Sequence, residues 1–322
     1  MKHKHHYTSL ILTVVLGVLV TGCSTHSALE ASDPLPSWHD GPTKQRIIEF
    51  VENVTDAQGQ YHVAPSDRIA VFDNDGTLWA EKPIYTQFLF ILDRIRVMAP
   101  DHPEWKTTQP FQAVLENDFE TLGSTDRDKL AHMMGIAVSG TTTEEFEDVV
   151  DEWMNSALHP VTGQPYTSMV YQPMIELLGY LEAHGFTNFI VSGGGSGFIR
   201  PWSERVYGIP PHRVVGSSME LEYDLLDGKP VIQRRPQLHF MNDKGGKPVG
   251  IERFIGHRPI LAAGNSDGDF QMLEWTTAGE GKRLGLIVHH TDAVREWSYD
   301  RDSTSGRLDR GLTEADARGW LL

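Results

Sequence analysis

The sequence predicts an α/β protein, a doubly wound, Rossmann-like parallel sheet with an inserted helical cap domain. Short, fully apolar runs recur along the chain, and polar or glycine-rich residues follow each of them directly. A block of more than a hundred residues with mostly helical patterns separates the first run from the second. The chain has 322 residues, more than one small core needs, so we expect a core domain that carries an insertion.

The chain begins with the features of an export signal. Lys2 and Lys4 precede an apolar stretch, residues 10–20, that is too short to span a bilayer comfortably. The stretch ends in VTGC, which resembles the bacterial lipobox, and the resemblance implies that Cys23 becomes the lipidated first residue. We predict a signal peptide over residues 1–22 and a flexible tether over 23–43, with an ordinary secretory peptide as the alternative. Cys23 is the only cysteine, which excludes an internal disulfide.

The core elements follow from apolar patterning. Residues 44–53 have apolar positions at helical spacing. The runs IAVF (69–72), FIV (189–191) and ILAA (260–263) suit the buried strands of a parallel sheet, and LGLIV (284–288) extends it. Open α/β sheets bind their ligands beyond the carboxyl ends of such strands.

The block between the first two strands is predicted as the cap, residues 82–185, because it is too long for a simple crossover. It contains a capping-box pattern, TTEE (142–145), and an amphipathic stretch, 172–184, that Gly185 can end. Residues 221–232 alternate loosely around Asp227-Gly228, which is a hairpin signal. The core then comprises residues 44–81 and 186–322, and Trp320 packs down a short helix in its tail.

Charge restricts the partners. Lys and Arg number 28 against 44 Asp and Glu, a formal net charge of −16. Such a surface repels nucleic acid and anionic membranes, so we expect no nucleic-acid partner. An anionic small substrate would need a local cation to hold it.

Asp73 and Asp75 stand on the tight turn that follows the first strand. Two close carboxylates repel each other unless a proton or a cation intervenes, and Mg²⁺ prefers such oxygen ligands. One carboxylate is then a candidate nucleophile and the other a candidate general acid/base. The alternative is an Asx-turn with solvated aspartates.

Three later segments offer complementary groups. Ser192 and Gly193 follow the second strand and can donate to an anion. Lys247, in KGGKPVGI (244–251), can neutralise a phosphoryl oxygen. GNSDGD (264–269) supplies further oxygen ligands after the third strand. Each segment alone is equally compatible with a turn or a solvated loop.

The order of DNDGT, strand-SG, Lys and GNSDGD resembles the haloacid dehalogenase superfamily of phosphohydrolases over about residues 67–295. The helical block, SGG (192–194) and the hairpin resemble its phosphoserine-phosphatase-like branch. The resemblance implies Mg²⁺-dependent hydrolysis of small phosphomonoesters through an aspartyl-phosphate at Asp73. The superfamily's dehalogenases lack an acid at position 75, so Asp75 points to phosphate esters.

The resemblance also implies individual roles. Asp75 protonates the leaving alcohol and then activates water, while Ser192 and Lys247 hold phosphoryl oxygens. Lys244 is the alternative lysine. Mg²⁺ is held by Asp73, the Asp75 carbonyl and a side chain of the last motif, where Asn265 stands in place of the usual Asp. The candidates for that ligand are Asn265, Asp267 and Asp269. Further candidates for phosphate or substrate binding are Thr77, Glu81, Trp79 and Arg200.

Alternatives remain at this stage. Trp79 with Glu81 suits an amine-bearing leaving group, or Trp79 simply packs the cap onto the core. Asn265 favours a second function, a non-catalytic binding lipoprotein with the same fold, and phosphotransfer to an acceptor other than water is a third. We expect the protein at the periplasmic face of a bacterial membrane, with the outer membrane as one option because Ser24 follows Cys23. The sequence leaves the oligomeric state open.

Overall fold

The computed structural model describes residue 1 and residues 33–322, and Pro34–Leu322 form one compact unit. The predicted signal peptide and Cys23 therefore lie outside the described residues. Within the described part of the chain, no helix has the length and apolar character needed to cross a membrane.

A six-stranded, mostly parallel sheet forms the centre, in the order β4-β3-β2-β1-β5-β6. β1 pairs in parallel with both β2 and β5, β5 pairs in parallel with β6, and β4 runs antiparallel to β3. The predicted fold class is confirmed, and each of the four predicted apolar runs forms part of a strand, with Ile260 and Val288 just outside β5 and β6. The strands are β1 (Ile69–Phe72), β2 (Thr187–Gly195), β3 (Val214–Leu226), β4 (Lys229–Phe240), β5 (Leu261–Gly264) and β6 (Leu284–Ile287).

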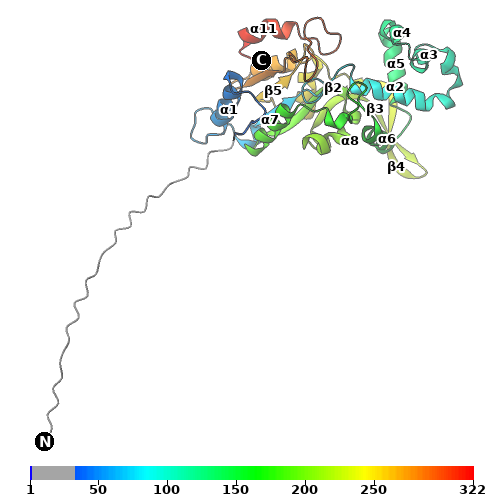
Figure 1. The fold of residues 1–322 in the computed structure, drawn as a ribbon. Coiled ribbons are helices and arrows are strands. Elements are labelled where there is room, and N and C mark those ends of the chain that lie inside the picture. The colour runs from blue at the N-terminus through cyan, green and yellow to red at the C-terminus, as the bar shows by residue number, and fades with distance from the viewer. Residues whose placement is uncertain (2–32) are drawn as a thin grey trace. The chain divides into compact units, whose positions relative to one another are not determined.

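Helices cover both faces of the sheet (Figure 1). Ala70 and Phe72 of β1 belong to one buried cluster, whereas Ile69 and Val71 belong to another, because successive strand residues face opposite sides. The first cluster includes residues of α1 (Pro42–Thr55), α7 (Gln172–Ala183) and α8 (Ser196–Tyr207). The second includes residues of α9 (Gly246–Phe254), α10 (Phe270–Thr277) and α11 (Arg310–Arg318). Burial on both faces explains why β1 and β5 are wholly apolar.

The helices between β1 and β2 gather mainly at one end of the sheet, at the right of Figure 1. The capping box at the start of α6 is confirmed, because Thr142 and Glu145 exchange hydrogen bonds. α5 packs closely on β4, since a Cβ at Gly135 would lie 2.4 Å from the carbonyl oxygen of Pro236. These helices are α2 (Thr86–Met98), α3 (Phe111–Glu116), α4 (Phe119–Ser124), α5 (Arg127–Ala137) and α6 (Thr143–Ser156). Short 3-10 helices connect elements at Pro65–Asp67, Ala99–Asp101, Pro103–Thr107, Tyr166–Ser168 and Pro211–Arg213.

The segment boundaries differ from the sequence prediction in two places. Leu35 is fully buried and Trp38 Nε1 donates to the carbonyl oxygen of Pro173 at 2.8 Å, so residues 34–43 pack on the compact unit although they were assigned to the tether. α7 was assigned to the cap, but Asn188 of β2 donates to its Leu178 carbonyl, and it lies in the core layer. Leu35 and Trp38 are isolated apolar residues in a polar segment, so the sequence had no periodic pattern that could predict their packing.

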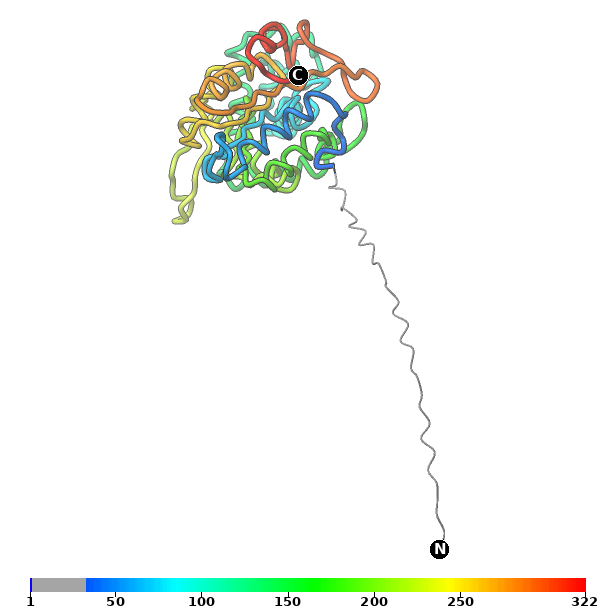
Figure 2. Tube along the Cα trace, turned by 90° about the vertical axis from the view of Figure 1, so that its left-hand side faces the viewer, coloured from blue at the N-terminus to red at the C-terminus, as the bar shows by residue number. Residues whose placement is uncertain are grey.

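The predicted hairpin and tail helix are confirmed. Leu226 and Lys229 are paired across Asp227-Gly228, and both turn residues have positive φ, at 51° and 77°, as a tight two-residue hairpin requires. Figure 2 shows the hairpin projecting from the body. The tail folds as α11, and the Trp320 ring packs edge-on against Phe270 at 5.1 Å.

Candidate active site

Strand register brings the chemical groups to one edge of the sheet. Phe72, the last residue of β1, is paired with Ile190 of β2 and Ala263 of β5. The polar segments that begin at Asp73, Ser192 and Gly264 therefore leave the sheet side by side. This is the edge where parallel α/β sheets bind ligands.

Lys247 joins two of these segments. Its Nζ donates to Asp73 Oδ1 at 2.6 Å and to Asp269 Oδ1 at 2.5 Å, and its side chain is 2% exposed. Lys244, the alternative lysine, is exposed. The structure thus places Lys247, not Lys244, at the centre of the site.

The pKa shifts follow from burial and charge. Burial raises the pKa of Asp73 and the negative charge of Asp269 raises it further, whereas Lys247 lowers it. Burial alone would lower the pKa of Lys247, but attraction to Asp269 and Asp73 outweighs burial and raises it. Burial also raises the pKa of Asp75, against the lowering effect of its hydrogen bond from Trp79. A raised pKa favours the protonated form of a carboxyl, which is the form that a general acid needs.

The turn after β1 holds Asp75 from behind. Trp79 Nε1 donates to Asp75 Oδ1 at 2.8 Å, and the Trp79 ring stacks on Trp202 at 4.4 Å. Gly76 has a φ of 78°, and a Cβ there would fall 2.1 Å from Asn265 Nδ2, so the turn needs glycine. Trp79 is fully buried and is not part of the cavity wall, so the amine-binding role considered for it has no support here.

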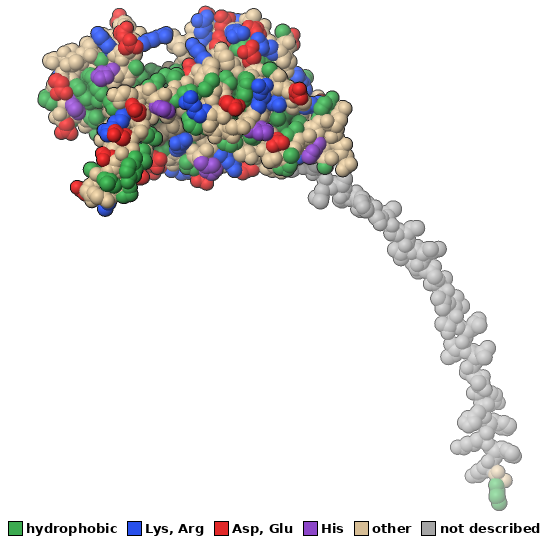
Figure 3. All heavy atoms as spheres, turned by 180° about the vertical axis from the view of Figure 1, so that it is seen from behind, with side chains coloured by type: hydrophobic (Ala, Val, Ile, Leu, Met, Phe, Trp, Pro, Cys, Tyr) green, Lys and Arg blue, Asp and Glu red, His purple; other side chains and the backbone are tan. Residues whose placement is uncertain are grey.

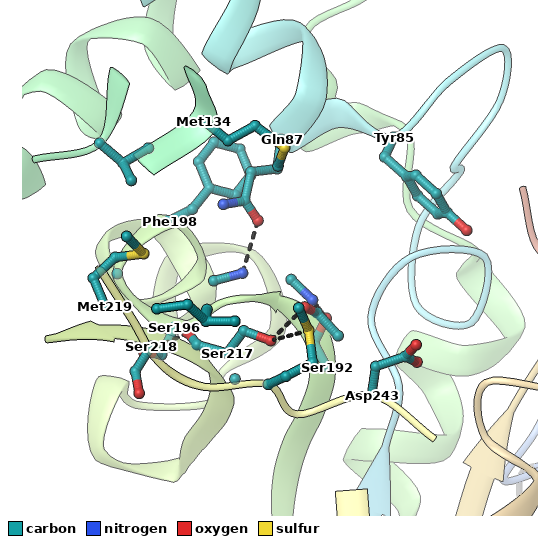
Figure 4. Close-up of a pocket in the computed structure, with 18 of the residues that line it drawn as sticks. Tyr85, Gln87, Met134, Ser192, Ser196, Phe198, Ser217, Ser218, Met219 and Asp243 are labelled. Carbon is teal, nitrogen blue, oxygen red and sulfur yellow. Dashed lines mark hydrogen bonds between the residues drawn. The ribbon is translucent and has the colours of Figure 1, made fainter. Parts of the chain in front are cut away.

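The end of β2 forms the opposite wall. Ser192 is 1% exposed and its Oγ accepts from the Gly194 N–H at 2.9 Å. Two residues that sequence reasoning missed hold this segment. Gln87 Oε1 accepts from the Gly195 N–H at 2.7 Å, and Asn242 Nδ2 donates to the Ser192 carbonyl at 3.0 Å. Figure 4 shows this contact of Gln87, which belongs to helix α2 of the cap.

The three candidate metal ligands of the GNSDGD segment have different hydrogen-bond partners. Asp269 Oδ2 accepts from the N–H groups of Asn265 and Ser266 at 3.0 Å each, while its Oδ1 is bound to Lys247. Asp267 instead accepts backbone N–H groups of residues 309–311 at the start of α11, at 3.2, 3.1 and 2.9 Å. The structure gives Asp267 a capping role, and a place for it among the metal ligands has no support.

Asn265 is paired with a carboxylate from the first turn. Its Nδ2 donates to Glu81 Oε1 at 2.8 Å, and its Oδ1 accepts from Thr77 Oγ1 at 3.1 Å. Glu81 is 1% exposed and also accepts from Tyr299 OH at 2.7 Å. Burial raises the pKa of Glu81 to about 7. Thr77 is fully buried and is not part of the cavity wall, and its hydrogen bond to Asn265 supports the turn.

The donor chemistry fits a magnesium ion. In residues 33–322, no group of three or more His, Cys, Asp or Glu side chains is arranged to hold a metal, and Lys247 already engages two of the aspartates. Three carboxylates nevertheless meet one ammonium at this centre, and the surrounding donors are oxygens. A divalent cation with oxygen ligands would balance the remaining charge. The carboxylates are those of Asp73, Asp75 and Asp269.

A cavity of about 1270 Å³ opens above this centre. Asp73, Asp75, Ser192 and Lys247 line one end of it, with Gly193 beside them. Glu81 and Arg200 also reach the wall, and the Arg200 guanidinium donates to the Val214 carbonyl at 3.1 Å. Carboxylates, an ammonium and a hydroxyl at one end of a large cavity suit the binding and activation of a phosphoryl group.

Comparison with known proteins agrees with this description. A family model described as haloacid dehalogenase-like hydrolase matches residues 70–274. A conserved protein of unknown function from Anaerococcus prevotii DSM 20548 is similar in structure, with 16% identity and a TM-score of 0.51 over 77% of this chain and 86% of that one. At that identity the likeness shows the fold alone.

Two further solved structures are similar at lower scores. A protein of unknown function from Bordetella pertussis Tohama I has 17% identity and a TM-score of 0.49, over 79% of this chain and 96% of that one. A phosphoserine phosphohydrolase-like protein from Francisella tularensis subsp. tularensis SCHU S4 has 18% identity and a TM-score of 0.40, over 78% and 98%. None of the curated proteins compared matches the sequence.

Proposed function

Because the chain belongs to the haloacid dehalogenase-like hydrolase family, we propose that it hydrolyses phosphomonoesters of small molecules, with Asp73 as the nucleophile. The observation that carries the proposal is the buried contact of Lys247 with Asp73 and Asp269, beside Asp75 and Ser192, which line the cavity. Phosphoryl transfer needs mainly positioning and neutralisation of charge, and this centre supplies both.

Asp73 performs the first step. Lys247 holds its Oδ1, and the described residues form no hydrogen bond to its Oδ2, which can therefore attack phosphorus. The bond to the ester oxygen breaks as the aspartyl-phosphate forms. The Ser192 Oγ already accepts from the Gly194 N–H, so its own proton is available for a phosphoryl oxygen.

Asp75 moves the protons. Its raised pKa lets it protonate the leaving ester oxygen, after which it is a carboxylate. In the second step it takes a proton from a water molecule that attacks phosphorus. Asp73 is then regenerated and inorganic phosphate leaves, so every proton is returned.

The oxygens of Asp73, Asp269 and Asn265 and the carbonyl of Asp75 are the candidate magnesium ligands. When bound, the ion would neutralise the negative charge of the phosphoryl group. Lys247 already supplies a positive charge beside Asp73, independently of any metal ion.

We also propose, from the lipobox-like VTGC alone, that Cys23 anchors the protein to the periplasmic face of a bacterial membrane, with the outer membrane as one option.

Phosphate release from a panel of phosphomonoesters, with Mg²⁺ and with EDTA, tests the proposal. We expect metal-dependent turnover that Asp73→Asn abolishes and Lys247→Met lowers at least a hundredfold. Lys244→Met is the matched control, because this exposed lysine should leave turnover unchanged. A folded protein that binds phosphate but turns over no ester would instead support the non-catalytic binding function, and transfer to an added alcohol would indicate phosphotransfer.

A further inference from the structure

The cavity extends well beyond the catalytic end into a chamber with an apolar wall. Met134 of α5, Phe198 of α8 and Met219 of β3 lie together on the side away from Ser192 and Asp243 (Figure 4). We infer that the leaving group of the preferred ester is a long, mainly apolar chain that occupies this chamber. The inference rests on the proposed function and names its substrate class, an amphiphilic phosphomonoester.

The chamber is built by both the cap and the core. Helix α2 contributes Phe88 and Ile91, and Val138 follows α5. Phe198 and Met219 line the same cavity, so an alkyl chain bound among these residues would lose contact with water. Burying apolar surface in this way stabilises a complex roughly in proportion to the area covered.

The size of the cavity supports a large ligand. Its volume is about 1270 Å³, above the range of roughly 300–1,000 Å³ that holds drug-sized ligands. A phosphoryl group and a small polar alcohol would fill only the end at Asp73 and Ser192. The apolar walls would then remain in contact with water. A small substrate would therefore gain no binding free energy from them.

The positively charged side chains near the chamber are engaged in its walls, while Glu147, Glu220 and Asp243 also line the cavity. Arg234 Nε donates to the Val138 carbonyl at 2.8 Å, and its guanidinium lies 3.9 Å from the centre of the Phe146 ring. Arg200 donates to the Val214 carbonyl. Glu81, at the catalytic end, is bound by Asn265 and Tyr299. Apolar side chains nevertheless form a large part of the lining that a leaving group meets.

The mouth of the chamber is apolar as well. Leu221, Leu238 and Met241 line the cavity and are also exposed, and the first two lie on the projecting β3–β4 hairpin. Leu225 and Leu226, near the hairpin turn, are exposed too but lie outside the cavity wall. Figure 3 shows hydrophobic side chains gathered over the projection. Leu221, Leu238 and Met241 therefore give an alkyl chain an apolar entrance to the cavity.

Binding of alkyl phosphonates from butyl to decyl tests the inference, because they cannot be hydrolysed and report the chamber independently of turnover. With the full chain and Mg²⁺, calorimetry below the critical micelle concentration should show the Kd falling up to about fourfold per added methylene. A Kd that does not change along the series, or no binding by any phosphonate, would overturn the inference.

Hydrolysis of the matching alkyl phosphates separates the two proposals. Chain-dependent phosphonate binding without hydrolysis of any ester would leave the chamber assignment standing and refute the phosphatase. Hydrolysis with a kcat/KM that does not vary with alkyl chain length would support the phosphatase and refute the chamber assignment.

Variants in which glutamine, a side chain of similar shape, replaces methionine show where the alkyl chain of the ligand binds. Met134→Gln and Met219→Gln should weaken decyl phosphonate binding at least tenfold while butyl phosphonate, which serves as the folding check, binds as before. Leu226→Gln is the matched control, because Leu226 is exposed on the hairpin outside the cavity wall. If Leu226→Gln weakens decyl binding as much as the two Met variants, the chain lies on the hairpin surface and the chamber assignment is wrong.

Discussion

Asp267→Ala discriminates between the capping role that the structure gives Asp267 and the metal role that its position in GNSDGD suggests. Its carboxylate accepts the N–H groups of residues 309–311 at 3.2, 3.1 and 2.9 Å. These are first-turn donors of α11, which have no partner within the helix. The substitution removes their acceptor and the favourable charge at the helix start.

The expected loss can be estimated from these contacts. Replacing a capping Asp by Ala typically destabilises by about 0.5–2 kcal/mol. Three acceptor contacts at a half-buried position place Asp267 near the top of that range, at about 2 kcal/mol. With an unfolding entropy of ~2.1 cal/mol/K per residue, the unit Pro34–Leu322 should then lose about 3 °C in Tm.

Thermal denaturation in EDTA and phosphate release in a Mg²⁺ titration measure both sides of the prediction. Asp267→Ala should lower Tm and leave kcat and the Mg²⁺ requirement nearly unchanged. Asp269→Ala, two residues away, is the matched control and should lower kcat at least a hundredfold, because Asp269 Oδ1 holds Lys247. An unchanged Tm for Asp267→Ala together with a weaker response to Mg²⁺ would refute the capping role.

Three further predictions concern the neighbouring groups and the anchor. Asn265→Asp should lower Tm in EDTA and recover it with Mg²⁺, because the new carboxylate faces Glu81 where an amide now donates at 2.8 Å; equal Tm values in EDTA would contradict this. The folded pKa of Glu81, about 7, lies above its ordinary value of 4.5, so the stability it contributes is complete below pH 4.5 and is lost as pH rises through 7. That loss is about 3 kcal/mol, and Glu81→Gln in EDTA should remove it from the Tm profile between pH 4.5 and 8, whereas an unaltered profile would show that another group is responsible. Cys23→Ser should move the protein from the membrane to the soluble fraction, and continued membrane association would exclude lipidation at Cys23.

The parts of the fold that the sequence predicted are those in which a single physical demand determines every residue. β1 and β5 are buried on both faces, so their apolar runs are unbroken and their ends are visible. The hairpin turn needs positive φ at two positions, which Asp227-Gly228 meets. By contrast, β3 begins with only two buried valines before polar residues, and its parallel pairing with β2 went unpredicted.

The candidate site was predictable in its motifs but not in its supports. Gln87 and Asn242 act on the backbone of other segments, and neither belongs to a recurring pattern. A polar residue soon after β4 was the one available signal for Asn242. Asp267 and Asp269 share one loop, and their different roles depend on α11, some forty residues further along the chain. That contact is set by tertiary packing.

Asn265 is best understood together with Glu81. A buried carboxylate needs hydrogen-bond donors, and Asn265 Nδ2 and Tyr299 OH supply them. An aspartate at position 265 would remove one donor and add a second charge beside the first. The enclosure is tight on one side, since a Cβ at Gly306 would lie 1.8 Å from Glu81 Oε1. The amide at position 265 is therefore the side chain that a buried Glu81 requires, while Asp73, Asp75 and Asp269 keep their carboxylates at the centre. For this reason Asn265 does not by itself favour the non-catalytic function. A Mg²⁺ titration that compares Asn265→Asp with the wild type then tests where the negative charge of the site is needed.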